Sequence, residues 1–380
     1  NIKRRTKSLA WLKRNKSNFF LLSITHKRKL AMKRILSIDG GGIRGIIPGM
    51  ILVALEERVQ KATNNPNAHL TDYFDFFAGT STGGILLSIL LCPDDDDPTK
   101  HKYSAKQALD IYLNHGEEIF TASTWRRFLN KFGLLSELYD NTVLEKVLQS
   151  YFGDKKMSEL LRPCIITAYN IELRKNHLFR QQKAISHGDS RDFFIRDVCR
   201  ATSAAPTYFS VAEIFSLAKT RYPLVDGGVF AHNPSLSALL EVIKNYNSYK
   251  IDDVWVLSLG TGLSKISYNY EDFKKKKAIS IGPALVDIMS SSSAESTDYY
   301  LKQLFHSVKK NNRYIRIEPN NLSSINPAMD AASTHNIQKI ISLGDKLVSE
   351  NEELLDEIVA GLIEDKRDKK DESVWNFLKR

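Results

Sequence analysis

The stretch DGGGIRG, residues 39–45, directly follows the apolar run ILSI at residues 35–38. A short apolar run that is bounded by glycine predicts a buried strand, here over residues 34–38. Glycine carries no side chain, so consecutive glycines allow backbone N–H groups to approach a bound group closely. The stretch therefore predicts a turn between a strand and a helix, which receives a phosphate or an oxyanion if it binds anything.

A second strand–glycine–helix unit follows the first. From Pro48 onward, apolar residues recur at helical spacing, and a proline suits the first turn of a helix. Residues 75–78 then predict a strand that leads into Gly79, and residues 85–91 predict a helix. Two such units indicate an α/β fold with a mostly parallel central sheet that is flanked by helices.

The rest of the chain adds elements of the same two kinds. Strands are expected at residues 164–168, Val254–Leu259 and Tyr314–Ile317, and helices at residues 191–204, 235–243, 281–308 and 334–363. No internal repeat and no clean linker separates them. We therefore expect one domain over residues 32–363, followed by a charged tail over residues 364–380.

The net charge of +10 is located in one segment. Residues 1–31 contain ten of the 54 Lys and Arg residues and no acid, so the remaining 44 basic residues balance the 44 acidic ones. The neutral body argues against a nucleic-acid polymer as partner. We expect the basic leader to lie outside the fold, as upstream or vector-derived sequence, a targeting segment, or an arm that touches anionic lipid. Met32 is the expected functional start.

Composition also limits the compartment. No apolar run approaches the ~20 residues that a membrane-spanning helix needs. The three cysteines, Cys92, Cys164 and Cys199, have no metal-binding spacing and make a poor disulfide framework, which favours a reducing compartment. The four consecutive aspartates at residues 94–97 lack the spaced ligands of a calcium loop, so they predict a solvated loop. We expect a cytoplasmic protein.

The sequence GTSTG, residues 79–83, has the G-x-S-x-G pattern of a nucleophile elbow. In such an elbow, glycines permit a strained turn that lifts the serine hydroxyl above the sheet edge at the start of a helix. The positive end of that helix stabilises an alkoxide or an oxyanion. We therefore predict that Ser81 is a nucleophile and that Gly79 and Gly83 allow the turn. An ordinary tight turn is the alternative.

The first glycine turn allows two interpretations. Residues 40–45 also match G-x-G-x-x-G, which in dinucleotide-binding folds is followed about twenty positions later by an acid at a strand end. The glutamates at 56–57 fall within the expected helix instead, which weakens that interpretation. In the other, the amides of residues 40–42 form an oxyanion hole for a reaction at the serine. Arg44 then supplies a cation near a phosphate headgroup or a developing charge, or is simply a solvent-exposed arginine.

A serine nucleophile needs a base, and two residues are candidates. Asp226 ends the apolar run PLVD at residues 223–226 and precedes Gly227 and Gly228, so its carboxylate can reach into a cleft. Its ordinary pKa of ~3.9 makes it a poor base unless burial raises that pKa. The alternative for this residue is a turn-forming Asp-Gly. Conventional esterases place a histidine after the acid, and His232 is the best candidate in that order.

Taken in order, DGGGIRG, GTSTGG and VDGGV resemble the three signatures of the patatin-like phospholipases. ATSAAPTYF (residues 201–209) and LSLGTG (residues 257–262) resemble further segments of that family. The resemblance spans roughly residues 33–263, so the leader and the C-terminal part lie outside it. It implies a three-layer fold similar to that of the α/β hydrolases, with a nucleophile elbow.

The resemblance also implies a serine–aspartate dyad without histidine. Ser81 matches the nucleophile, Asp226 the base, Gly40, Gly41 and Gly42 the oxyanion loop, and Arg44 the basic position behind it. The implied activity is that of a lipid acyl hydrolase, which cleaves fatty-acyl esters of phospholipids or galactolipids through an acyl-enzyme, without a metal or cofactor. Its substrate would be a phospholipid membrane surface, with the protein peripheral at the membrane.

Several alternatives stay open at this point. One is a Ser–His–Asp carboxylesterase on soluble esters, with His232 as the base. Another is a catalytically silent module that binds a lipid or a nucleotide. Some bacterial relatives resemble defence effectors that a cyclic nucleotide switches on, so a small-molecule activator is a further hypothesis, although no residue marks its site. Residues 201–209 either pack at a helix end or form a wall of the active site.

Overall fold

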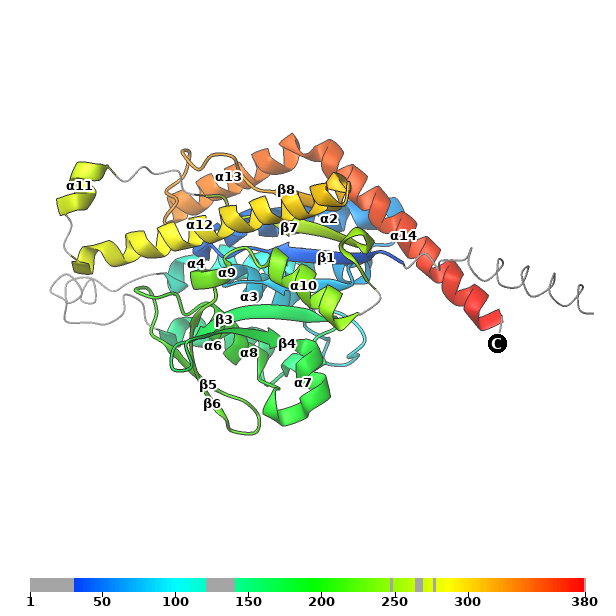
Figure 1. Cartoon of the computed structure of the whole chain (residues 1–380), viewed down its shortest axis with the longest axis horizontal. Coiled ribbons are helices and arrows are strands. Elements are labelled where there is room, and N and C mark those ends of the chain that lie inside the picture. Colours follow the sequence, from blue (N-terminus) through cyan, green and yellow to red (C-terminus); the bar gives the residue numbers. More distant parts are fainter. Residues whose placement is uncertain (1–30, 121–140, 247–248, 264–268, 276–277, 379–380) are drawn as a thin grey trace, which may run out of the picture. The chain divides into compact units, whose positions relative to one another are not determined.

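Strand β1 (Lys33–Ile38) forms at the predicted position and lies inside an eight-stranded sheet (Figure 1). The structure is a computed structural model that describes residues 31–120, 141–246, 249–263, 269–275 and 278–378. The predicted basic leader falls on residues 1–31, so all of it except residue 31 lies outside the described residues.

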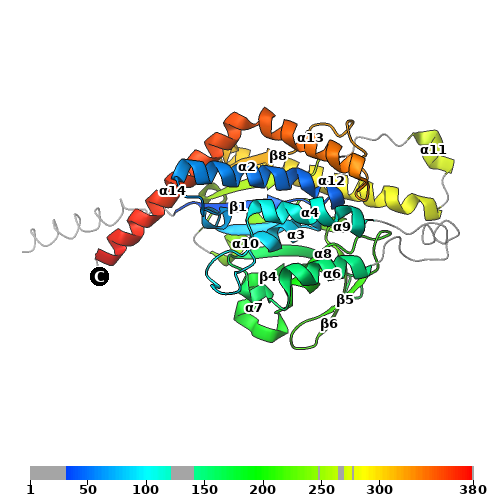
Figure 2. The same ribbon diagram turned by 180° about the vertical axis from the view of Figure 1, so that it is seen from behind.

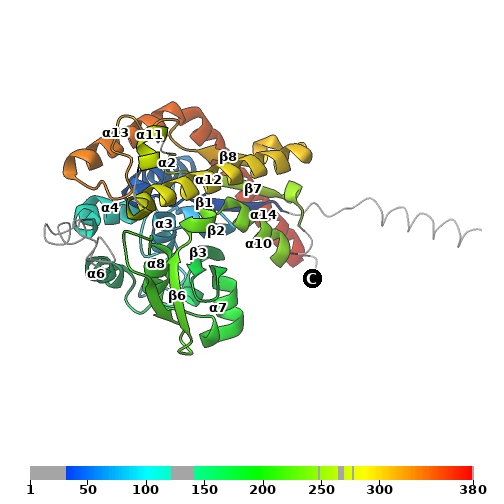
Figure 3. The same cartoon turned by 60° about the vertical axis from the view of Figure 1, so that its left-hand side comes forward.

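The order of the sheet is β5–β6–β3–β2–β1–β7–β8, and β4 pairs with β3 off this path. The remaining strands are β2 (Phe76–Gly79), β3 (Cys164–Asn170), β4 (Lys175–Arg180), β5 (Ala212–Phe215), β6 (Arg221–Asp226), β7 (Val254–Leu259) and β8 (Tyr314–Ile317). From β3 to β8 along this order the strands run parallel, whereas β4 and β6 run antiparallel to β3. In Figures 1 and 3 the β5–β6 pair lies at the lower end of the sheet and β8 at the upper end.

The helices are interspersed with these strands along the chain. They are α2 (Ile46–Thr63), α3 (Thr82–Leu90), α4 (Ala105–Ile119), α6 (Asn141–Phe152), α7 (Gln181–His187), α8 (Ile195–Thr202), α9 (Gly228–Ala231), α10 (Ser235–Asn245), α11 (Tyr270–Lys275), α12 (Ala278–Ser307), α13 (Thr334–Glu350) and α14 (Glu352–Leu378). Capping is visible in the sequence at Ser104, whose side chain and that of Gln107 form a capping box at the start of α4.

The two faces of the sheet bury separate cores, because neighbouring residues of a strand point to opposite faces. From β1, Leu36 and Ile38 enter a large core that α2, α3, α4, α8 and α13 cover. Ile35 enters a smaller core on the opposite face, under α10 and α12. These two helices lie in front of the sheet in Figure 1, and α2 and α4 lie in front of it in the reverse view of Figure 2. The predicted α/β fold with a mostly parallel sheet and helices on both faces is confirmed.

Some elements differ from the prediction. The helix expected over 334–363 is two helices, since Asn351 ends α13 and its side chain donates to the carbonyl of Leu347. Helix α14 then continues to Leu378, through the segment expected to be a charged tail. The helix expected from residue 191 begins only at Ile195. The short strands β4 and β5 and the helices α4 and α6 were not predicted.

Two further findings concern the whole described chain. All three cysteines belong to the described residues, and each is buried and free. Among the described residues, no helix is both long enough and apolar enough to cross a membrane.

Candidate active site

The strand register brings Ser81 and Asp226 together. Strand β4 pairs with residues 165–170 of β3 and thereby occupies one edge of that strand. The other edge is shared, because β2 pairs with residues 164–166 and β6 with residues 168–170. Since β6 runs antiparallel, its last residue, Asp226, lies nearest to the end of β2. Ser81 follows β2 by two residues, so it stands level with Asp226.

Ser81 adopts a backbone conformation that is unfavourable for serine. Its φ is 52°, a left-handed value that non-glycine residues rarely adopt, and it is the N-cap residue of α3. The Ser81 amide donates to Thr202 Oγ1 at 2.9 Å, and Thr202 Oγ1 donates to the carbonyl of Thr167 at 2.6 Å. Conformations of this kind persist only where the surroundings hold them, and they cluster at active sites.

Gly83, two residues after the serine, allows this turn to approach β1 closely. A Cβ atom at Gly83 would lie 2.2 Å from the carbonyl oxygen of Ile38, at the end of β1. Any side chain at this position would push the start of α3 away from the sheet. The predicted G-x-S-x-G elbow is therefore formed as a sharp turn between β2 and α3.

Asp226 is a buried carboxylate that faces the serine. Its side chain is 5% exposed, and Oδ1 accepts the N–H of Gly228 at 2.7 Å. Burial raises the pKa of Asp226 to about 6, while hydrogen bonds from the Ser81 side chain and the Gly228 amide limit the rise. A carboxylate with a raised pKa is a stronger base than an ordinary aspartate. The arrangement can accept the proton of the serine hydroxyl near neutral pH.

The first glycine turn lies beside this pair, after β1. The Gly40 amide donates to the carbonyl of His232 at 3.1 Å, and the Ile43 amide donates to the carbonyl of Met329 at 2.9 Å. Between them, the amides of Gly41 and Gly42 have no hydrogen-bond acceptor among the residues that the structure describes. Of the three glycines predicted to line an oxyanion hole, Gly40 therefore has its N–H occupied.

Gly42 is required at its position in this turn. Its φ is 59°, and a Cβ atom there would lie 2.1 Å from the carbonyl oxygen of Met329. An L-residue would thus be strained in its backbone and would collide with a neighbouring peptide. Gly42 and Ser81 also line the same cavity.

Arg44 lies inside the protein, so the alternative of a solvent-exposed arginine is wrong. Its side chain is 4% exposed; Nη1 donates to the carbonyl of Gly262 at 2.8 Å and Nε to that of Gly41 at 3.4 Å. Burial lowers the pKa of Arg44, and nearby acidic groups, Asp287 first, act against that change. Both of these hydrogen bonds go to main-chain carbonyls, so Arg44 supports the glycine turn.

His232 is close to the pair but is not oriented as a catalytic base. A Cβ atom at Gly40 would lie 3.2 Å from the Ser81 Cβ and 3.4 Å from His232 Nδ1. Within the described part of the chain, no hydrogen bond joins the His232 ring to Ser81 or Asp226. Burial lowers the pKa of His232 to about 3, so the imidazole stays neutral.

An apolar cavity opens beside the serine. It is lined by Gly42, Ser81 and Thr82, and by a set of mainly aliphatic and aromatic side chains. The apolar lining includes Ile85, Ile111, Tyr112, Ile119, Phe120, Leu144, Tyr208, Phe209 and Met329. Such a lining suits a hydrocarbon chain far better than a charged or strongly polar ligand.

Some of these residues were not singled out from the sequence. Residues 201–209 include both a helix end and a wall of the candidate site. Helix α8 ends at Thr202, whereas Tyr208 and Phe209 line the cavity. Thr202 itself supports the elbow, which no local pattern indicates. Among the described residues, no group of three or more His, Cys, Asp or Glu side chains is placed to hold a metal ion.

Comparison with known proteins gives consistent matches. Residues 36–239 match the Patatin family profile, described as patatin-like phospholipase. Patatin group J-1 from Solanum tuberosum is 32% identical over 334 residues, covering 83% of this chain and 84% of that protein. Patatin-2-Kuras 3 from the same organism is 31% identical and covers 87% and 88%. The crystal structure of VipD from Legionella pneumophila aligns with 83% of this chain and 67% of its own, at 12% identity and a TM-score of 0.34, which carries no argument.

Proposed function

The chain belongs to the patatin-like phospholipase family and is therefore a lipid acyl hydrolase; we propose that it is a phospholipase of the A type with a Ser81–Asp226 dyad. It cleaves fatty-acyl esters of phospholipids or galactolipids and passes through an acyl-enzyme. The observation that carries this proposal is a strained serine that faces a buried aspartate with a raised pKa at the wall of an apolar cavity.

Acylation begins with the serine. Ionised Asp226 accepts the proton of the Ser81 hydroxyl while Oγ attacks the ester carbonyl carbon, which gives a tetrahedral intermediate. The carbonyl oxygen gains the negative charge and lies against the amides of Gly41 and Gly42. The intermediate collapses, the C–O bond to the alcohol breaks, and the proton on Asp226 passes to the departing lysolipid oxygen.

Deacylation repeats these steps with water. Asp226, ionised again, accepts a proton from a water molecule as the water oxygen attacks the acyl-enzyme carbonyl. The second tetrahedral intermediate releases Ser81, which recovers its proton from Asp226, and the fatty acid leaves. One removed oxyanion-hole donor typically costs ~3–4 kcal/mol of transition-state stabilisation, so two free amides are a sizeable part of such a catalyst.

The cavity supports the choice of a lipid substrate. An acyl chain that lies among Ile111, Phe120, Leu144 and Phe209 places its carboxyl end at Ser81. Removing a chain from water contributes about 0.8 kcal/mol per buried CH₂ group, which favours long chains over acetate-like esters. The partner of the enzyme is then a phospholipid membrane surface from which single acyl chains are taken up.

The deciding experiment is fatty-acid release from vesicles of phosphatidylcholine and, separately, of galactolipid. We expect release by the wild type, and release at background level by Ser81→Ala and Asp226→Asn. His232→Ala is the matched control, and we expect it to stay active because, among the described residues, no hydrogen bond joins its ring to either member of the dyad. Covalent labelling by a fluorophosphonate should occur in all variants that keep an activated serine.

Each rival predicts a different pattern. A Ser–His–Asp carboxylesterase loses activity with His232→Ala and prefers soluble short-chain esters to vesicles. A catalytically silent module neither releases fatty acid nor reacts with fluorophosphonate. If wild-type protein reacts with the probe but releases fatty acid only after a cyclic dinucleotide is added, the enzyme requires an activator.

A further inference from the structure

The loop after β7 contacts the first glycine turn (residues 39–45), hereafter the oxyanion turn. It contains Gly260, Thr261 and Gly262, the end of the LSLGTG stretch. Resting on the proposed function, we propose that Thr261 is a positioning residue that aims the Gly41 amide at the reacting carbonyl, and that Arg316 anchors the base of the same turn through Asp39. Both Thr261 and Arg316 lie beyond residues 36–239.

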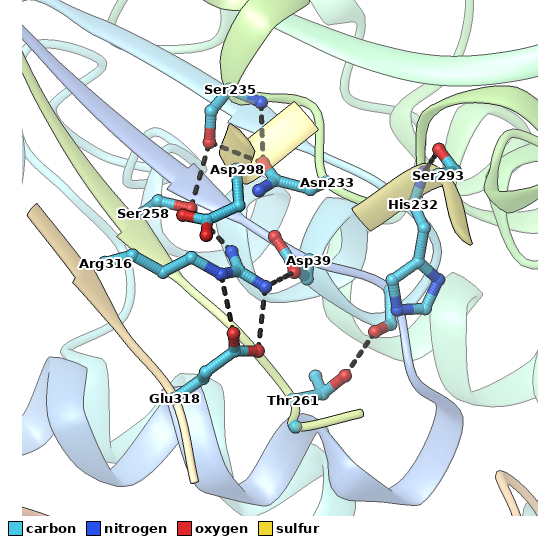
Figure 4. Close-up of polar contacts among 12 residues, drawn as sticks. Asp39, His232, Asn233, Ser235, Ser258, Thr261, Ser293, Asp298, Arg316 and Glu318 are labelled. Atoms are coloured by element: carbon cyan, nitrogen blue, oxygen red, sulfur yellow. Dashed lines mark hydrogen bonds and ion pairs between the residues drawn. The ribbon is translucent and has the colours of Figure 1, made fainter. Parts of the chain in front are cut away.

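The contact made by Thr261 is short and specific. Its Oγ1 donates to the carbonyl oxygen of Gly40 at 2.5 Å, and the residue is 1% exposed (Figure 4). The Gly40 C=O and the Gly41 N–H belong to one planar peptide and point in opposite directions. Fixing the carbonyl toward Thr261 therefore turns the Gly41 N–H away from this loop, toward the side on which its amide is free.

The same side chain limits how the glycine turn can rotate. A Cβ atom at Gly41 would lie 2.4 Å from Thr261 Oγ1, so the threonine packs directly against the peptide that it bonds. Next to it, the Gly40 amide donates to the His232 carbonyl at 3.1 Å. The peptide groups on both sides of Gly40 are thus held, and the amides after them remain available to a ligand.

Arg316, on β8, fixes the residue where the turn begins. Its Nη2 donates to Asp39 Oδ2 at 2.7 Å, its Nη1 to Ser258 Oγ at 2.8 Å, and its Nε to Glu318 Oε1 at 2.9 Å (Figure 4). Burial acts to lower the pKa of Arg316, but Asp39 and Glu318 outweigh it and raise that pKa well above its ordinary value, so Arg316 stays charged. The Asp39 amide also donates to the carbonyl of Leu259 at 3.0 Å. The start of the turn is thereby tied to both β7 and β8.

Removal of the hydroxyl tests the proposal without a change of shape. We would compare wild type, Thr261→Val, Thr261→Ser and Thr63→Val on a p-nitrophenyl ester of octanoic acid, counting active sites by fluorophosphonate titration. Thr63→Val is the matched control, because Thr63 Oγ1 also donates to a main-chain carbonyl, that of Val59 at 2.7 Å, within α2. Melting temperature is recorded for each protein.

For Thr261→Val we expect kcat per titrated site to fall roughly tenfold to hundredfold with KM nearly unchanged, because small misplacements of catalytic groups cost up to about 10² in rate. Thr261→Ser should restore most of the rate, and Thr63→Val should keep it even if its melting temperature falls. A purely structural role would lower the melting temperature of Thr261→Val and leave kcat per site unchanged, which overturns the inference. A raised KM with normal kcat also overturns it.

Arg316→Lys gives a second test. Lysine keeps the charge but not the planar fork that joins Asp39 and Glu318, so we expect an intermediate loss of kcat per titrated site with KM unchanged. Wild-type rates in this variant would overturn the part assigned to Arg316. Ser81→Ala separates the two levels of the proposal: if wild type hydrolyses the ester no faster than Ser81→Ala, the proposed function fails and this inference fails with it.

Discussion

The two glycine turns of the site lie on neighbouring strands but are held by different parts of the chain. At the nucleophile turn, Thr80 Oγ1 bonds to Thr167 Oγ1 at 2.7 Å and donates to the Ala231 carbonyl at 2.6 Å, and Thr202 supports the next amide. All of these groups are neutral, and all lie before residue 232. At the oxyanion turn, the partners come mainly from residues 259–329 and include the buried guanidinium of Arg316.

The difference indicates that separate parts of the sequence support the two turns. The segment that carries the three recognisable signatures contains the proposed nucleophile, its base and both glycine turns, and it supports the nucleophile turn. The segment after it, which the family profile does not cover, supports the proposed oxyanion turn. Hydrolysis of an ester needs the nucleophile turn and the oxyanion turn to be correctly placed relative to each other. Substitutions in the first segment should therefore reduce activity through the nucleophile, and substitutions in the second through the oxyanion donors.

The largest effect is expected from the oxyanion turn itself. Gly42→Ala forces a left-handed residue against the Met329 carbonyl, so we expect kcat/KM on a soluble ester to fall at least ~100-fold, close to the loss of one oxyanion donor. Gly361→Ala is the control, because a Cβ atom there meets nothing within 4 Å and an alanine suits helix α14. Near wild-type activity of Gly42→Ala would show that this turn does not bind the oxyanion.

The pH dependence of kcat/KM tests the base at the nucleophile turn. Asp226 must be ionised to accept a proton, and its pKa is raised to about 6. Activity should therefore be half-maximal near pH 6 and fall about tenfold for each pH unit below 5. Because Asp39, the buried carboxylate of the other turn, can also titrate, the profile of Asp39→Asn should be recorded. If Asp39→Asn loses the inflection, the group that titrates is Asp39 in the oxyanion turn and not Asp226.

A smaller effect is expected at the support of the elbow. Thr202→Val leaves the Ser81 amide and the Thr167 carbonyl without their buried partner, which costs about 1–3 kcal/mol of unfolding free energy. Freed from that bond, the strained serine can relax, and we expect a roughly tenfold loss of kcat per titrated site. Thr202→Ser keeps the hydroxyl and should recover both. An equal loss in both variants would show that the hydroxyl alone does not hold the turn.

The smallest effect concerns stability. Burial raises the folded-state pKa of Asp226 above the ordinary 3.8, so above pH 6 the folded protein bears the cost of an ionised, buried carboxylate. Asp226→Asn removes that cost, about 2–3 kcal/mol, and its melting temperature at pH 8 should exceed that of wild type by a few degrees. The advantage should shrink as pH falls below 6 and nearly vanish by pH 4. Calorimetry at both pH values checks this.

Much of the fold could be predicted because the informative elements are buried and locally patterned. The apolar strands β1, β2, β3 and β7 are short runs next to glycines, and the predicted Val254–Leu259 and Tyr314–Ile317 match their strands residue for residue. By contrast, β4 has the polar sequence KNHLFR, so its pairing with β3 is decided by its neighbour and not by its own pattern. Without β4, the shared edge that aligns Asp226 with the serine cannot be inferred.

Local sequence patterns mark the two candidate reacting groups of the site but not the residues that support them. Ser81 and Asp226 lie in glycine turns that local sequence marks, and the structure brings them into contact. Thr202, Thr261 and Arg316 act over long separations in the sequence through side-chain hydrogen bonds, and such contacts leave no periodicity in the sequence. The burial of Arg44 could not be predicted from the sequence either, because a charged residue at a helix start is usually exposed.

The position of β1 in the sheet has a consequence for the synthesis of the protein. Its residue Ile38 pairs with Gly79 on one side and with Leu259 on the other. The strand that pairs with the second edge of β1 is therefore synthesised more than two hundred residues after β1 itself. On the ribosome, the elbow can assemble once residue 231 has emerged, while the oxyanion turn lacks Thr261, Arg316 and Met329 until later. We expect a chain that ends before these residues to contain the nucleophile turn without the groups that hold the oxyanion turn in place.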